Sequence, residues 1–123
     1  MEKPSAADTQ FSIAKRVRSF TNAGRGLRVF IQGTHNAWVH IGVLLLAIML
    51  GFYFHITRVE WMLLVLAGGL VLAAEAFNTA LEIDMDLTSP QYHPQARDTK
   101  DVAAGAVLIC AIAALIVGVL IFL

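Results

Sequence analysis

The chain carries little charge and almost no cysteine. Only 15% of its 123 residues are charged, against roughly 25% in an average soluble domain. Basic and acidic side chains balance to a formal net charge of zero, which removes the electrostatic case for nucleic-acid binding. Cys110 is the single cysteine, so a disulfide framework within the chain is excluded. The composition therefore argues against an ordinary soluble globule, a nucleic-acid-binding module and a disulfide scaffold.

Apolar residues are plentiful instead, at 58% of the chain, and they form three long runs. The runs cover residues 37–56, 61–82 and 102–123. A helix needs about 20 mostly apolar residues to cross the hydrocarbon core of a bilayer. The third run has no charged residue, and as a helix it would rise about 33 Å. We therefore expect one domain, an all-α integral membrane protein with three transmembrane helices.

Basic residues predict how these helices are oriented. Most of them precede the first span or lie in the segment 83–101, and Arg58 alone lies in the other connection. Short loops rich in Lys and Arg stay on the cytoplasmic side. We therefore expect the N-terminus and the loop at 83–101 to be cytoplasmic. Within that loop, Asp98 is expected to cap the third helix, with Asp101 in its first turn.

The segment 11–33 has an apolar stripe of helical period. Its members recur at alternating steps of four and three, and they are Ile13, Val17, Phe20, Gly24, Leu27 and Ile31. The basic side chains fall outside this stripe, so the segment predicts an amphipathic helix lying in the membrane interface. The plainer alternative is a basic flank that only sets the topology. Residues 1–10 are expected to be disordered, because they have little to bury.

Acidic residues lie where a membrane helix should have none. At about 100° per residue, Glu75, Asn78, Glu82 and Asp86 share one narrow face, whereas Asp84 points to the opposite side. Ionisable groups in a membrane helix normally face a protein interior or a wet cavity and have a function. A polar clamp between helices is the structural alternative. Three carboxylates repel one another unless they share a cation or a proton, so we favour the functional interpretation.

Carboxylates near the cytoplasmic surface suit a divalent cation that is also bound by substrate phosphates. Glu75 lies further into the membrane, where its carboxylate would be free to act as a base on a lipid hydroxyl. Phosphoryl transfer needs chiefly positioning, a metal and cationic clamps on the phosphates. The clamps available in this chain are Lys15, His93 and Lys100.

At these residues the chain resembles the prokaryotic diacylglycerol kinase family. The matching stretches are Glu75-Ala-Phe-Asn78-Thr-Ala-Leu-Glu82, then Tyr92-His93-Pro94, then Lys100-Asp101-Val-Ala-Ala-Gly-Ala-Val. A three-part motif of this length is far more specific than one short pattern. The resemblance implies a homotrimeric lipid kinase of the bacterial cytoplasmic membrane, each protomer having a surface helix and three spans, with MgATP as phosphoryl donor.

The family's motif also implies roles for individual residues. Glu75 would be the catalytic base and Asn78 its positioning neighbour. Glu82, with Asp86 as a further candidate, would bind Mg²⁺. Nucleotide contacts would come from Lys15, Glu82, Gln91, Tyr92, His93, Lys100 and Asp101.

Thr34 departs from the family, which often has a second metal-binding glutamate at this position. A neutral hydroxyl is a weak ligand for Mg²⁺. Water, Asp86 or phosphate oxygens would have to supply the missing Mg²⁺ ligand.

Two questions stay open at this point. The family contains both diacylglycerol and undecaprenol kinases, and Tyr92-His93-Pro94 with the Lys100-Asp101 stretch looks more like the undecaprenol branch. The other class is a small proton-coupled transporter or accessory subunit with Glu75 as a proton relay. Such a protein has no need for nucleotide-binding side chains beside the acidic face.

Other polar and small residues of the spans have simpler interpretations. His40 and His55 flank the first span, where an amphipathic ring suits the interface, so we do not expect them to bind metal. Gly68, Gly69 and Gly105 are expected to permit close helix approach.

Overall fold

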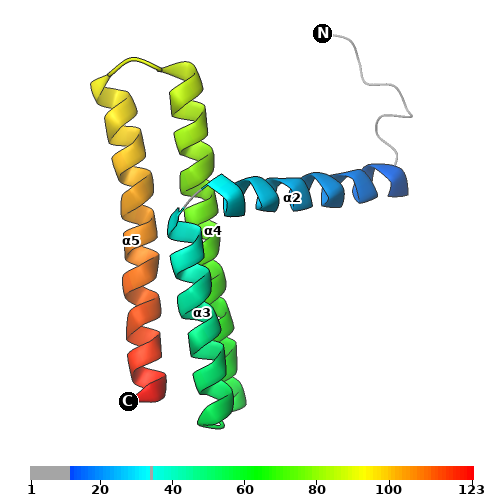
Figure 1. Ribbon diagram of the computed structural model, residues 1–123, viewed down its shortest axis with the longest axis vertical. Coiled ribbons are helices and arrows are strands. Elements are labelled where there is room, and N and C mark those ends of the chain that lie inside the picture. Colours follow the sequence, from blue (N-terminus) through cyan, green and yellow to red (C-terminus); the bar gives the residue numbers. More distant parts are fainter. Residues whose placement is uncertain (1–11, 34) are drawn as a thin grey trace.

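The computed structural model describes residues 12–33 and 35–123, which form four helices (Figure 1). Thr34 and the segment 1–10 lie outside the described residues. The helices are α2 (Ile13–Gly33), α3 (His35–Tyr53), α4 (Arg58–Thr88) and α5 (Pro94–Phe122). The described part of the chain contains no strand, so the prediction of an all-α protein is confirmed.

Three of the helices form an elongated bundle. α3, α4 and α5 run side by side along the long axis, and α2 extends crosswise from the bundle near the beginning of α3 (Figure 1). Each of the three is long and apolar enough to cross a membrane, as predicted. The end of α4 and the beginning of α5 project beyond the level of α2 (Figure 1).

α2 leaves its apolar stripe uncovered. Ile13 is 73% exposed and Phe20 80% exposed, whereas Phe30, outside the predicted stripe, is buried. An exposed apolar stripe with cations on the other faces is the arrangement of a helix that lies in a membrane interface. The crosswise position of α2 agrees with that placement.

The predicted loop at 83–101 is wrong in extent. α4 continues as helix to Thr88 and α5 begins at Pro94, so the connection is reduced to residues 89–93. His93 is the N-cap of α5, and its Nδ1 accepts a hydrogen bond from the Gln95 backbone N at 3.1 Å. The predicted Asp98 cap is therefore also wrong. Hydropathy identifies the part of a helix that suits lipid, while caps and proline at the first turn decide where the helix starts.

The connection between α3 and α4 lies three residues earlier than predicted, at 54–57 instead of 57–60. α3 ends at Tyr53, and His55 adopts a positive φ of 52° in the turn that follows. Thr57 caps α4, since its Oγ1 accepts from the Glu60 backbone N at 3.2 Å while the Glu60 carboxylate accepts from the Thr57 backbone N at 3.3 Å. This reciprocal capping box starts α4 at Arg58, three residues before the predicted 61.

Two glycines allow α3 and α4 to pack closely. A Cβ at Gly51 would lie 2.7 Å from the Trp61 ring, and one at Gly68 would lie 2.5 Å from a methyl group of Leu44. Gly69 and Gly105 have no such neighbour within 4 Å in the described chain. The expectation of close approach therefore holds at Gly68 and not at the other two positions within one chain.

The variant Gly51→Ala should destabilise the protein, because the added methyl group meets a rigid indole ring of the neighbouring helix. Overpacking of this kind costs about 1–3 kcal/mol, which exceeds the gain of about 1 kcal/mol in helix propensity. Thermal unfolding in detergent should show a lower midpoint for Gly51→Ala. Gly69→Ala is the matched control and should leave the midpoint unchanged or raise it. Equal midpoints for Gly51→Ala and the parent would contradict the packing seen at Trp61.

Candidate active site

Glu75 is a buried carboxylate in the middle of α4. The residue is 2% exposed, and its Oε2 lies 3.6 Å from Nε2 of His40 on α3. His40 is in the second turn of α3, about 7 Å along the helix from its first residue. Since α2 joins the bundle near that first residue (Figure 1), the Glu75 carboxylate lies a little more than one helical turn below the level of the crosswise helix.

Asn78 continues the same face toward the Thr88 end of α4. Its Nδ2 donates to Oε1 of Glu82 at 3.4 Å. Its Oδ1 is buried and has no hydrogen-bond partner. A buried carbonyl oxygen without a partner costs roughly 1–3 kcal/mol, and such atoms in native structures call for an explanation. Thr79, by contrast, is satisfied within the helix, where its hydroxyl donates to the Glu75 backbone O at 3.0 Å.

The acidic face then leaves the bundle core. Glu82, about 10 Å along the helix from Glu75, is half-buried, and Asp86 is exposed. Lys100 of α5 pairs with Asp86, with 2.6 Å between Nζ and Oδ1. This contact joins the two arms of the projecting α4–α5 hairpin. The predicted grouping of Glu75, Asn78, Glu82 and Asp86 on one face is thus observed, with Lys100 at its outer end.

The remaining nucleotide candidates lie around the hairpin tip. Tyr92 is exposed, and its hydroxyl accepts from Nη1 of Arg97 at 3.1 Å. Nδ1 of His93 caps α5, so Nε2 on the other side of the ring takes no part in the cap. Gln91 and Asp101 are both exposed.

Lys15 is not near this group within one chain. It lies in the first turn of α2, and that end of α2 extends away from the bundle (Figure 1). A single chain therefore brings Lys100 to the acidic face and leaves Lys15 apart from it.

Metal ligands are few within one chain. Among residues 12–33 and 35–123 no three His, Cys, Asp or Glu side chains cluster closely enough to hold an ion. Asp86 is already engaged by the Lys100 ammonium, so a cation there would compete with that pair. Glu82 and the free Oδ1 of Asn78 are the hard oxygen donors that remain on this part of the face.

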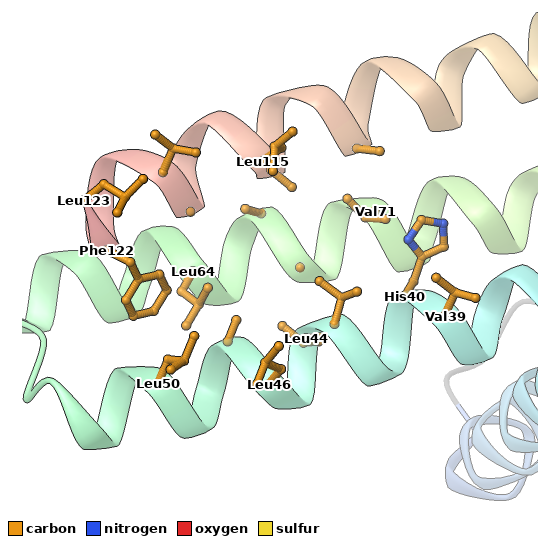
Figure 2. A pocket seen from close by; sticks show the side chains of 18 residues that line it. Val39, His40, Leu44, Leu46, Leu50, Leu64, Val71, Leu115, Phe122 and Leu123 are labelled. Carbon is orange, nitrogen blue, oxygen red and sulfur yellow. The ribbon is translucent and has the colours of Figure 1, made fainter.

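Sequence reasoning missed the place of His40 in the site. His40 was interpreted as an interfacial ring, yet it contacts the buried Glu75. It also lines an apolar groove of about 550 Å³ between α3, α4 and α5, where Figure 2 shows its ring at one end. Of the described residues that line this groove, His40 alone has a polar side chain. The available signal was a histidine inside a run of apolar residues.

Comparisons with known proteins show the family of the chain. The sequence profile of the prokaryotic diacylglycerol kinase family matches residues 21–122. The chain belongs to the prokaryotic diacylglycerol kinase family. It is 37% identical to an undecaprenol kinase of Bacillus subtilis over 86% of each chain. It is 40% identical to a diacylglycerol kinase of Synechocystis over 81% of this chain and 58% of the relative, and 28% identical to a diacylglycerol kinase of Helicobacter pylori over 82% and 84%.

Membership in this family confirms the prediction of a membrane lipid kinase. The alternative of a proton-coupled transporter has no support from the comparisons. The named relatives include both an undecaprenol kinase and diacylglycerol kinases.

Proposed function

We propose that the protein transfers the γ-phosphoryl group of ATP to the hydroxyl of a membrane lipid alcohol, undecaprenol or diacylglycerol. The observation that carries this proposal is the Glu75 carboxylate, buried at 2% exposure just below the level of α2. A lipid hydroxyl lies at that depth, whereas a soluble nucleotide reaches the projecting α4–α5 hairpin. The acidic face of α4 extends from the depth of Glu75 to this hairpin.

Glu75 acts as the general base. It accepts the hydroxyl proton of the acceptor as the acceptor oxygen bonds to the γ-phosphorus and the bond from that phosphorus to the ADP oxygen breaks. Asn78, one turn along the same face, positions the reacting groups through its free Oδ1. In phosphoryl transfer most of the catalysis comes from such positioning and from charge stabilisation.

The donor set fits Mg²⁺ bound jointly with nucleotide. Glu82 offers a half-buried carboxylate and Asn78 an unpartnered amide oxygen, and Mg²⁺ is commonly held by one or two protein carboxylates together with phosphate oxygens. When bound, the ion neutralises charge on the phosphates. Asp86 is a secondary candidate, because Lys100 occupies it in this structure.

The hairpin holds the nucleotide. Lys100 clamps phosphate oxygens, and the exposed Tyr92 and His93 contact ATP, with Gln91 and Asp101 as further contacts. We also propose a homotrimer with its N-terminus in the cytoplasm. Protein interfaces between protomers would shield Glu82 from lipid, which offers polar groups no partners, and would let Lys15 of one protomer approach the hairpin of another.

The direct test is a transfer assay with labelled ATP in lipid vesicles. Purified protein should phosphorylate undecaprenol and diacylglycerol presented separately, with undecaprenol preferred as the motif indicates. Release of phosphate to water without any labelled lipid would contradict the proposal.

Glu75→Gln should lower turnover by about 10²–10⁴, the range of general base catalysis. The amide keeps the shape of the carboxylate and cannot accept the proton. Asp84→Asn removes a carboxylate on the opposite, exposed side of α4 and should leave turnover unchanged. Turnover of Glu75→Gln near that of the parent would show that the base lies elsewhere.

Glu82→Gln should raise the Mg²⁺ concentration needed for half-maximal rate, because an amide oxygen is a weaker ligand than a carboxylate for a hard cation. The magnesium titration at saturating ATP measures this directly, with Asp84→Asn again as the control. A titration that coincides with that of the parent would remove Glu82 from the metal site.

Lys100→Met should raise the KM for ATP about tenfold, because a charge-assisted contact to phosphate is lost. Stability should change little, since ion pairs at the protein surface contribute little to folding. Arg58→Met, at the opposite end of the bundle, is the control. An unchanged KM together with lower stability would make Lys100 a purely structural residue.

A further inference from the structure

His40 occupies a place that the proposed chemistry has not yet used. Its Nε2 lies 3.6 Å from Oε2 of Glu75, and the two side chains are 23% and 3% exposed. Within the described part of the chain, His40 is the side chain recorded in contact with that carboxylate. The other polar neighbours are committed elsewhere, since Asn78 donates to Glu82 and Thr79 donates to the backbone.

We propose that His40 is a positioning residue for Glu75. Its Nε2–H donates to Oε2, which leaves Oε1 free to accept the proton of the lipid hydroxyl. The observed separation is slightly longer than a hydrogen bond, and catalytic hydrogen bonds are often long before substrate binds and shorten in the complex. The proposal needs only a hydrogen on Nε2, which both the imidazolium ion and one neutral tautomer provide.

His40 lies on α3 and Glu75 on α4, so their contact restricts the glutamate side chain from a second helix. A glutamate side chain has several rotatable bonds, and a rotation of its carboxylate moves the accepting oxygen relative to the hydroxyl. A misplacement of about 1 Å can cost about 10²-fold in rate. His40, held on α3 and packed at the end of the apolar groove (Figure 2), fixes the carboxylate from the side opposite its own helix.

Three substitutions at one position test this role. His40→Leu removes the donor, His40→Asn keeps an amide that is too short to reach Oε2, and His40→Gln places its amide nitrogen near the position of Nε2. We expect kcat to fall about 10- to 100-fold in the Leu and Asn variants and to recover most of its value in the Gln variant. The KM for ATP should not change, because the Lys100–Asp86 pair of the hairpin lies about three helical turns along α4 from Glu75.

A matched control and a measurement of folding accompany the series. His55→Asn removes an exposed imidazole at the other end of α3 and keeps a residue that tolerates positive φ, so its kcat should equal that of the parent. If His40→Leu does not fold, the comparison of Asn with Gln decides. Equal kcat in all variants, equal losses in Asn and Gln, or a rise in the KM for ATP at unchanged kcat would each overturn the proposal.

Because this role rests on the proposed lipid-kinase activity, a readout without substrate is needed as well. Nuclear magnetic resonance of isotopically labelled histidine should show one imidazole signal that disappears in His40→Gln and moves in Glu75→Gln. The same signal should stay in place in Asp84→Asn. A signal unmoved by Glu75→Gln would disprove the contact whatever the activity. An inactive parent with a moving signal would instead overturn the proposed function and the positioning role, and leave the contact standing.

Discussion

The structure depends on the burial of one carboxylate in a helix that crosses a membrane. An ionisable group at this depth costs several kcal/mol unless protein or water solvates it. Glu75 is covered by α3, whose His40 is the polar group that meets it. For this contact to form, α3 and α4 must approach closely along their length. Gly51 and Gly68, whose missing side chains admit Trp61 and Leu44, make that approach possible.

Helix α4 also connects the membrane, which contains the lipid substrate, with the water that contains the nucleotide. α2 extends crosswise near the beginning of α3, and the α4–α5 hairpin projects past it (Figure 1). With α2 in the interface, the hairpin reaches water while Glu75, buried against α3, lies at the depth of the hydrocarbon core. A rigid helix therefore fixes the distance between the proposed base and the proposed nucleotide contacts, and no soluble kinase domain is required.

Sequence reasoning predicted what depends on local periodicity. The acidic face of α4 follows from 100° per residue, and the three spans follow from apolar length, because both properties are set within one segment. Helix ends were predicted poorly at 83–101, where His93 and Pro94 define the start of α5. His40 was missed because it contacts a residue 35 positions later in the chain, and no periodicity within one helix encodes a contact between two helices.

The polar groups along α4 show where the chemistry should occur on that face. At the inner end, α3 supplies His40 to Glu75, and at the outer end, α5 supplies Lys100 to Asp86. Between them, Asn78 donates to Glu82 and keeps an unpartnered Oδ1. Folding alone does not explain a buried oxygen without a donor, because that atom costs stability. A water molecule on a hydrated cation would donate the missing hydrogen bond, which agrees with the proposed binding of Mg²⁺ together with nucleotide beside Asn78, between Glu75 and the Lys100–Asp86 pair.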